Sequence, residues 1–155
     1  MRNRVAVTGI GVVANVGQGS SDFWDGLLTG VPSHGFEILD FDPLPYFDGN
    51  AKEARRCDRF AQLAFAAADE AITQAGDFAN DPTRCGSWVG TGVGGLDTLE
   101  KQVQVMSEKG PRRVSPFLIP MLMANAASAG ISMKYGLQGP SETTVTACVA
   151  GTHSI

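Results

Sequence analysis

The chain has 155 residues, 43% of them hydrophobic and 18% charged, a composition that indicates a single soluble globular domain. Its formal net charge of −4 argues against nucleic acid as a partner. Three cysteines without a CxxC spacing argue against a disulfide framework and a zinc site. No signal or transit peptide is readable, so we expect a cytoplasmic protein with reduced thiols.

Hydrophobic periodicity in the first half predicts strands, helices and a loop. The expected elements are a strand at 4–8, a short amphipathic helix at 20–28, a loop over 31–50 with a brief strand at 36–39, and a long helix at 53–74. The long helix would carry Cys57 and Phe65 on its apolar face, with Gly76 as its C-terminal stop.

The second half continues the alternation of strands and helices. We expect a strand at 85–90, a helix at 96–109, a strongly apolar helix at 117–133 and a strand at 143–147. Strands that alternate with crossover helices predict an α/β fold with a mixed sheet. No internal repeat or linker interrupts the pattern, so we predict one domain over residues 1–155.

Two glycine-rich stretches follow expected strands. GIGVVA, residues 9–14, has the spacing of a dinucleotide-binding turn, but no acidic residue follows at the required distance. GTGVGG, residues 90–95, is not followed by Lys-Ser or Lys-Thr, which excludes a nucleotide P-loop. We favour a tight turn after a strand for the first stretch, and closely packed backbone or a pocket wall for the second.

The apolar stretch at 117–133 reads FLIPMLMANAASAGISM. It is too short for a comfortable membrane span and contains Pro120 and Asn125. A buried helix is favoured, which either fills the core or lines a slot for an apolar chain. The sequence alone leaves these two alternatives open.

Cys148 has the strongest chemical signature in the chain. β-Branched residues lead into it and small residues follow, which is typical of a strand–turn–helix that presents a nucleophile. At such a helix start, free amides and the helix dipole lower a thiol pKa from roughly 8.5 toward neutrality, and the amides face an oxyanion during acyl transfer. A buried, inert thiol is the alternative, which we favour for Cys57 and Cys85.

Neither histidine is expected to supply a base for this thiol. His153 lies roughly 140° away from Cys148 around a helix, and His34 lies in a loop.

Seven of the twelve basic residues fall in two short stretches. They are Lys52, Arg55, Arg56 and Arg59 in the first, and Lys109, Arg112 and Arg113 in the second. They either attract a small acidic partner or form a solvated helix face with Glu53 and Asp58 as counter-charges.

Five stretches together resemble the β-ketoacyl-acyl carrier protein synthases of the thiolase superfamily, most closely the elongating condensing enzymes of bacterial fatty acid synthesis. They are VAVTGIGVV, KEARRCDRFAQLAFAAADEAITQAG, GTGVGG, RRVSPFLIPMLMANAASAGISMKYGLQGP and TVTACVAGTHSI. The resemblance implies a layered thiolase-like α/β fold, of which this chain is similar to the N-terminal half, cut just after the nucleophile. Two departures are a short loop at 30–50 and Ala150 in place of a more usual serine.

The resemblance also implies roles for particular residues. Cys148 matches the cysteine that accepts an acyl group from the phosphopantetheine arm of an acyl carrier protein. The positions that match the acyl pocket, partly across a dimer interface, are Val93, Leu118 and Leu122. The positions that match the carrier-docking patch are Lys52, Arg55, Arg56, Arg112 and Arg113. The implied partners are the acyl carrier protein and, in the full-length protein, a second copy, with no nucleic acid, membrane, metal or resident cofactor.

The implied function is an acyltransferase that catalyses decarboxylative Claisen condensation of an acyl thioester with malonyl-acyl carrier protein in fatty acid biosynthesis. The resemblance assigns the two active-site histidines to the other half of the family's sequence. We therefore expect the 155 residues alone to be inactive and prone to aggregation. The alternatives are a polyketide ketosynthase, a non-catalytic module that docks carriers or oligomerises, and a nucleotide-binding oxidoreductase based on GIGVVA.

Overall fold

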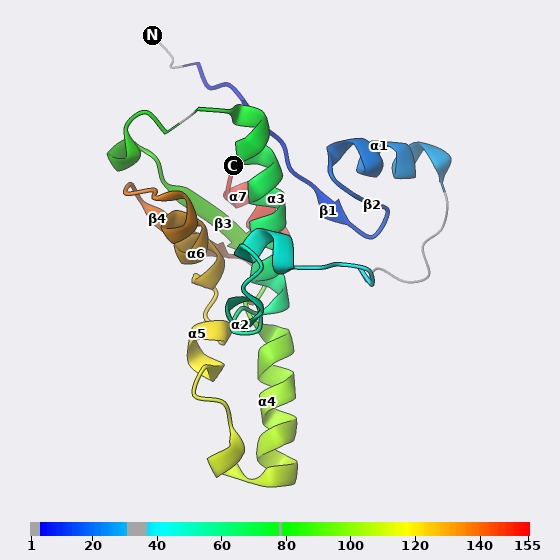
Figure 1. Cartoon of the computed structure of the whole chain (residues 1–155), viewed down its shortest axis with the longest axis vertical. Helices are drawn as coiled ribbons and strands as arrows, with labels where there is room; N and C mark the ends of the chain where they lie inside the picture. Colours follow the sequence, from blue (N-terminus) through cyan, green and yellow to red (C-terminus); the bar gives the residue numbers. More distant parts are fainter. Residues whose placement is uncertain (1–3, 31–36, 78) are drawn as a thin grey trace.

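The computed structural model describes residues 4–30, 37–77 and 79–155, which form a mixed α/β structure (Figure 1). Its strands are β1 (Val13–Ala14), β2 (Gly17–Gln18), β3 (Ser87–Thr91) and β4 (Ser141–Val145). Its α-helices are α1 (Ser20–Thr29), α2 (Ala51–Ala54), α3 (Arg59–Ala75), α4 (Leu96–Lys109), α5 (Leu118–Leu122), α6 (Ala126–Tyr135) and α7 (Ala150–His153). Short 3-10 helices are η1 (Leu44–Phe47), η2 (Pro82–Arg84), η3 (Pro111–Arg113) and η4 (Ala147–Val149).

The described strands form two separate two-stranded sheets. β1 and β2 are antiparallel, whereas β3 and β4 are parallel and in register from Ser87 opposite Ser141 to Thr91 opposite Val145. The connection between the parallel strands contains α4, α5 and α6, because parallel neighbours need a crossover. The expected α/β class with crossover helices is confirmed, although these strands lie in two small sheets rather than one mixed sheet.

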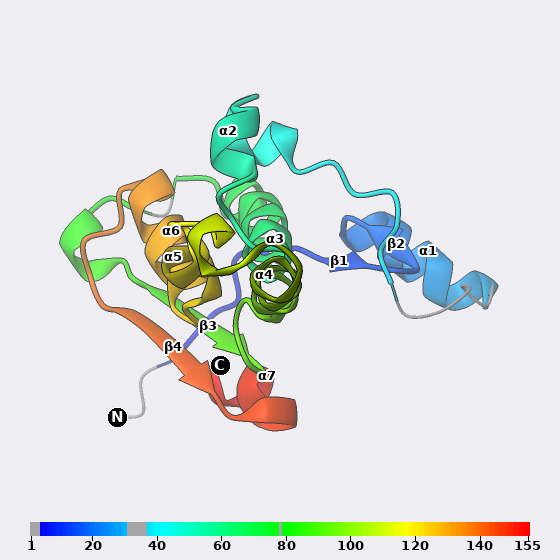
Figure 2. The ribbon, with the colours of Figure 1, turned by 90° about the horizontal axis from the view of Figure 1, so that it is seen from below.

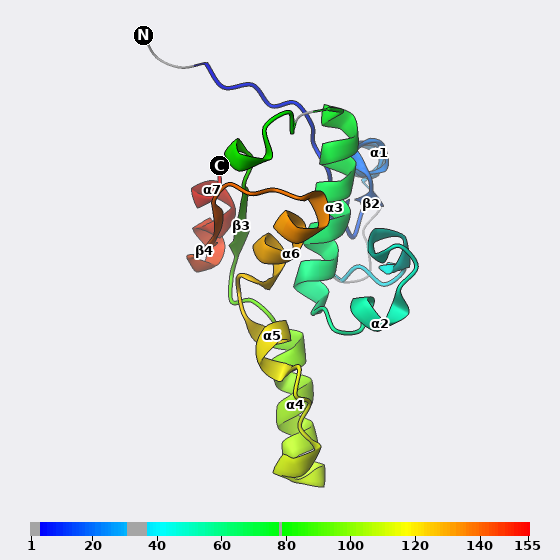
Figure 3. The ribbon, with the colours of Figure 1, turned by 60° about the vertical axis from the view of Figure 1, so that its left-hand side comes forward.

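Helices cover both faces of the β3–β4 pair. Figure 2 shows α6 on one face and α7 on the other, and Figure 3 shows α3 on the side of α6 away from β3, as a further layer. The hydroxyl of Ser87 on β3 donates to the backbone oxygen of Ser128 in α6 at 2.7 Å. Phe65 of α3 packs over Gly130 of α6, where a Cβ would overlap the phenyl ring. With Ile131, Phe65 belongs to the buried core, which therefore lies between α3, α6 and the sheet.

The strand predicted at 4–8 is wrong. Within the described residues this segment pairs with no strand, and its two valines are 94% and 81% exposed. The chain crosses α3 directly afterwards, because Gly9 and Gly11 lie against carbonyl oxygens of successive helical turns, where any Cβ would overlap. The glycines of GIGVVA therefore allow close approach to a helix and do not form a turn after a strand.

The long helix predicted at 53–74 begins later than expected. A turn separates α2 from α3, and Asp58 is the N-cap of α3. Its Oδ1 accepts a hydrogen bond from the backbone N–H of Phe60 at 3.1 Å, which is the bond that starts a helix. Cys57 therefore lies in the turn rather than on the helix face. The predicted stop at Gly76 is correct.

The single helix predicted at 117–133 is divided into α5 and α6. Met123 interrupts it with an extended backbone, φ −56° and ψ 130°. The glycine-rich loop packs against this break, where Gly95 N–H donates to the backbone oxygen of Leu122 at 3.0 Å. α6 is buried against the sheet and α3. In the part of the chain that the structure describes, no helix has the length and apolar character needed to cross a membrane.

The remaining elements match their predictions with small shifts. α1 and α4 occupy the ranges expected at 20–28 and 96–109. β3 and β4 are displaced by one or two residues from 85–90 and 143–147. Phe36, the first residue of the predicted strand at 36–39, lies outside the described residues, and the other three form no strand.

Glu70 on α3 anchors the N-terminal segment. Its carboxylate accepts hydrogen bonds from the backbone N–H of Val12 at 2.8 Å, and from the backbone N–H and the hydroxyl of Ser20, both at 2.7 Å. These bonds, first of all that from the Ser20 backbone, hold the pKa of Glu70 below its usual value of 4.5, although partial burial raises it. Folding therefore favours the ionised carboxylate.

We predict that Glu70→Gln lowers the free energy of unfolding at neutral pH by about 1 kcal/mol, a small value for bonds to a charged group because water screens the half-exposed carboxylate. Because the folded-state pKa lies below the unfolded value, this contribution is complete above 4.5 and disappears as pH falls through the folded pKa. Urea titrations of both proteins across this range measure the difference. A difference that stays constant as the solution is acidified would contradict the anchoring role of the charge.

Candidate active site

Cys148 lies on a turn between β4 and α7. β4 ends at Val145, the single turn η4 contains Cys148, and α7 starts at Ala150. The side chain of Cys148 is exposed. Ala147, directly before it, has a φ of 49°, in the left-handed region that costs a residue with a Cβ about 1 kcal/mol or more. Backbone strain of this kind is concentrated at functional sites.

Gly90 sets the distance between this turn and the sheet. α7 crosses β3 at Gly90, where a Cβ would overlap the backbone oxygen of Ala150 and the hydroxyl of Ser154. The Ser154 hydroxyl itself donates to that oxygen at 2.7 Å, so the space is filled. The helix that follows Cys148 can lie this close to the sheet only because residue 90 has no side chain.

The parallel strands bring the glycine-rich loop to the same edge as Cys148. Because Thr91 is opposite Val145, the residues that follow the two strands leave the sheet together (Figure 3). Residues 92–95 follow β3, and the Cys148 turn follows β4. A Cβ on Gly94 would lie 2.9 Å from the backbone oxygen of Leu122. The structure thus agrees with the interpretation of GTGVGG as closely packed backbone.

The three predicted pocket residues lie on two elements that contact each other. Val93, in the glycine-rich loop, is 59% exposed. Leu118 and Leu122 lie at the two ends of α5 and are half-buried. The loop is joined to the end of α5 by the bond from Gly95 to Leu122. An apolar helix end is therefore connected, through the loop, to the edge of the sheet that carries Cys148.

The predicted docking residues are all exposed and form two groups. They are Lys52, Arg55 and Arg56 in and after α2, and Arg112 and Arg113 in η3. The guanidinium of Arg56 stacks over the ring of Phe117 at 4.0 Å, directly before α5. The second group lies beyond the far end of α4, a helix of 14 residues and therefore about 21 Å long (Figure 1). The first group therefore contacts the residue before α5 through Arg56, and residues 114–117 separate the second group from α5 along the chain.

Asp58 does not lie on the surface, as it would if it were a counter-charge to the basic residues on a solvated helix face. It is 3% exposed, and besides capping α3 it accepts a hydrogen bond from the backbone N–H of Thr98 in α4 at 2.8 Å. A carboxylate directly before a helical pattern is the signal that identifies a capping residue.

The other two cysteines differ from Cys148 in exposure. Cys57 is half-buried, and burial, with a smaller effect of the Asp58 carboxylate, raises the pKa of its thiol to about 12. Cys85 is half-buried, and its thiol donates to the backbone oxygen of Asp81 at 3.3 Å. Of the three cysteines, Cys148 is the one that is exposed rather than half-buried.

His153 contacts the turn that contains Cys148 through Thr146. Its Nδ1 lies 3.1 Å from the hydroxyl of Thr146, two residues before Cys148. The pair links α7 back to the end of β4, which fits the packing or capping expected of this histidine. His34, the other histidine, lies outside the described residues.

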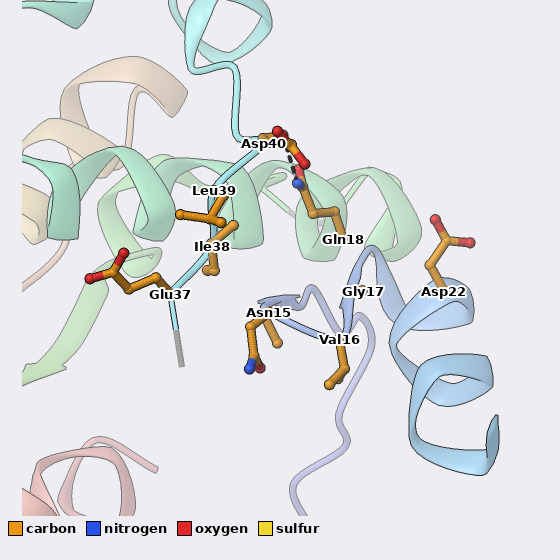
Figure 4. Close-up of a pocket in the computed structure, with 10 residues that line it drawn as sticks. Asn15, Val16, Gly17, Gln18, Asp22, Glu37, Ile38, Leu39 and Asp40 are labelled. Carbon is orange, nitrogen blue, oxygen red and sulfur yellow. Dashed lines mark hydrogen bonds between the residues drawn. The ribbon is translucent and has the colours of Figure 1, made fainter. Parts of the chain in front are cut away.

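A pocket of about 600 Å³ lies elsewhere, between the β1–β2 hairpin and residues 37–40. Figure 4 shows the Gln18 amide donating to the backbone oxygen of Asp40, a bond of 3.0 Å, with the carboxylates of Asp22 and Glu37 on opposite sides. None of the predicted site residues lines it. Over the ranges described, no cluster of His, Cys, Asp and Glu can hold a metal ion. The candidate active site is therefore placed at Cys148.

Sequence comparisons identify the family of the chain. A family model described as "Beta-ketoacyl synthase, N-terminal domain" matches residues 31–155. The chain belongs to the beta-ketoacyl synthase family. A 3-oxoacyl-(acyl-carrier-protein) synthase 2 from Synechocystis is 39% identical over 99% of the chain, and one from Staphylococcus aureus is 41% identical over 98%. The matches cover 41% and 40% of these relatives, so the chain spans about two fifths of their length.

Solved structures share the fold. A structure of a type II PKS acyl-carrier protein in complex with its ketosynthase, bound to the hexaketide, matches with a TM-score of 0.85 and 27% identity, covering 99% of this chain and 44% of that one. A beta-ketoacyl synthase from Burkholderia phymatum matches with a TM-score of 0.68 and 20% identity, covering 95% and 40%. The thiolase-like α/β fold expected from the sequence is confirmed.

We predict that iodoacetamide at mildly alkaline pH modifies Cys148 and leaves Cys57 unmodified. With a pKa of about 12, the Cys57 thiol is ionised roughly a thousandfold less often than a thiol at the ordinary value of 9.0. Mass spectrometry of the peptides, sampled over time, gives both rates. Equal rates would show that burial does not protect Cys57.

We also predict that Gly90→Ala lowers the thermal midpoint, because the new Cβ pushes α7 away from β3 at a cost of about 1–3 kcal/mol. Gly92→Ala is the matched control, since a Cβ at that position meets nothing within 4 Å. Calorimetry of the two variants separates the packing effect from the general effect of removing a glycine. Unchanged stability in Gly90→Ala would mean that α7 does not lie this close to the sheet.

Proposed function

We propose that the chain carries the nucleophile of a β-ketoacyl-acyl carrier protein synthase and that Cys148 is that nucleophile. The observation that carries the proposal is the exposed thiol on a strained turn, at the sheet edge it shares with the glycine-rich loop. The names of the curated relatives support the reaction class.

In this reaction the Cys148 sulfur, as thiolate, attacks the carbonyl carbon of an acyl group held as a thioester on the acyl carrier protein. The carrier's phosphopantetheine thiol leaves and takes up a proton, and the acyl group stays on Cys148. A malonyl unit on a second carrier then loses CO2, and its carbanion attacks the new thioester. The β-ketoacyl product leaves on that carrier, and the Cys148 thiolate is restored.

The surroundings of Cys148 support the first half of this reaction. The backbone N–H of Cys148 is suited to stabilise the oxyanion that forms during acyl transfer, whereas those of Val149 and Ala150 donate within the turn. Phosphopantetheine arrives on the carrier, so the chain's own residues need bind no resident cofactor and no metal.

The acyl chain is proposed to lie against Val93, Leu118 and Leu122. The connection of the glycine-rich loop to α5 supports this assignment, because it joins the end of this apolar helix to the loop that leaves the sheet beside Cys148. Of the two alternatives for the apolar stretch at 117–133, we therefore favour the slot for α5 and core packing for α6.

The proposed partner is the acyl carrier protein. It is acidic, and exposed basic groups at Lys52, Arg55 and Arg56, with Arg112 and Arg113 farther along, give it a complementary surface. We propose a cytoplasmic homodimer for the complete protein.

The 155 residues alone are proposed to lack condensing activity. The family resemblance assigns two catalytic histidines to sequence that these residues do not match, and the chain spans about two fifths of its relatives. A ketosynthase of polyketide synthesis is the second candidate, favoured by the structural likeness to a type II PKS ketosynthase. The non-catalytic docking module is the third, and it differs because it requires no reactive thiol.

The test is acyl transfer to the complete protein that contains this sequence. We expect an acyl carrier thioester to add one acyl mass to the protein, located at Cys148, and Cys148→Ala to lose the transfer by about four orders of magnitude or more. Cys85→Ala is the control, because it removes a half-buried thiol before the start of β3, at the opposite end of the sheet from Cys148, and should transfer normally.

Transfer that persists in Cys148→Ala would exclude Cys148 as nucleophile. Carrier binding without any acyl transfer in the unmodified protein would favour the docking module instead. Condensation assays with fatty acyl and polyketide starter thioesters distinguish the two enzyme classes.

A further inference from the structure

One buried carboxylate connects the starts of two helices. Asp58 is 3% exposed. Its Oδ1 accepts from Phe60 N–H at the start of α3, at 3.1 Å, and its Oδ2 accepts from Thr98 N–H in the first turn of α4, at 2.8 Å. Both helix N-termini therefore converge on the same side chain, where their dipoles favour a negative charge.

The two helix starts belong to different parts of the proposed site. The basic turn, defined as residues 52–56, leads directly to Asp58, and the amide of Gln62 holds this region by donating to two backbone oxygens at 2.8 and 3.2 Å. The glycine-rich loop, residues 90–95, leads directly into α4. Asp58 thus joins the segment that carries the basic groups to the segment that carries Val93.

Capping of α3 does not by itself require a carboxylate with two partners. Serine is an equally good N-cap, and it avoids the cost of burying a charge. Serine is also too short to hold α4 at the same time. The second oxygen of Asp58 therefore has a role beyond capping α3: by binding α4 it fixes the distance between the basic turn and the glycine-rich loop.

We infer that Asp58 is a positioning residue for the carrier protein: it holds the basic turn in the place from which a docked carrier delivers its thioester to Cys148. This inference rests on the proposed function. The phosphopantetheine arm has a fixed length, so a carrier that delivers its thioester to Cys148 can contact the basic turn only when that turn lies at the matching distance from the sheet edge. A displaced basic turn loses part of this contact in the productive complex, which weakens carrier binding and raises KM.

The test compares two substrates in the complete protein. One is an acyl carrier thioester, which must dock, and the other is an acyl N-acetylcysteamine thioester, which is too small to use the basic turn. In Asp58→Ser we expect the KM for the carrier substrate to rise about tenfold, the scale of one hydrogen bond to a charged group, while kcat and the KM for the small thioester stay unchanged.

Asp81→Ser is the matched control. Asp81 also caps a helical turn, by accepting from Thr83 N–H at 3.1 Å, but it lies beyond the opposite end of α3. This variant should leave both substrates unaffected.

A second variant removes the donor instead of the acceptor. Thr98→Pro deletes the N–H that Asp58 accepts from, at a first-turn position where proline is tolerated, and leaves the cap of α3 in place. It should produce the same selective rise in the KM for the carrier substrate. Amide hydrogen exchange reports the link directly, because the Thr98 amide should exchange faster in Asp58→Ser and not in Asp81→Ser.

The outcomes separate the possibilities. If the Thr98 amide exchanges faster and carrier KM is unchanged, or if both substrates lose activity in parallel, Asp58 has only a structural role and the inference is overturned. If the unmodified protein transfers no acyl group from either substrate, the proposed function fails, and this inference fails with it. This result is distinct from failure of the Asp58 inference alone, because it is obtained with the unmodified protein and needs no variant.

Discussion

The close approach of α7 to Gly90 is the constraint on which the candidate active site depends. β3 and β4 are parallel and end at one edge, so the chain after β4 must turn back over the sheet. It does so within η4, through the left-handed residue Ala147, and the returning helix lies directly on the backbone of Gly90. The turn is short and strained for this reason, and it leaves the side chain of Cys148 exposed.

The same principle, backbone placed on backbone by glycine, also operates at other places in the described chain. Gly9 and Gly11 lie on α3, and Gly94 and Gly95 lie on the break between α5 and α6. The result is a site assembled from loops and helix ends that are held by main-chain geometry, with the Asp58 carboxylate as the charged link between the basic turn and α4.

Sequence patterns predicted the features that depend on local order along the chain. The helix at 96–109, the glycine stop after α3 and the strand before Cys148 all have local signals, and the structure contains them. Features that depend on contacts between distant segments were not predictable. Val5 and Val7 have the composition of a strand, yet no described strand pairs with them. The apolar run at 117–133 contains Asn125, which takes the N-cap position of α6, but the contact of the glycine-rich loop with the break depends on distant residues.

The register of β3 against β4 also has a consequence during synthesis of the protein. β3 cannot pair with β4 until the ribosome has reached Ser141, the partner of Ser87. The residues of α4, α5 and α6 are synthesised in between, which takes roughly three to ten seconds at ribosomal rates. Throughout that interval the backbone N–H and C=O groups with which β3 will pair to β4 are unpaired, and such groups can pair with strands of other chains. The segment that shapes the reactive turn is therefore open to pairing with other chains while the polypeptide is still emerging.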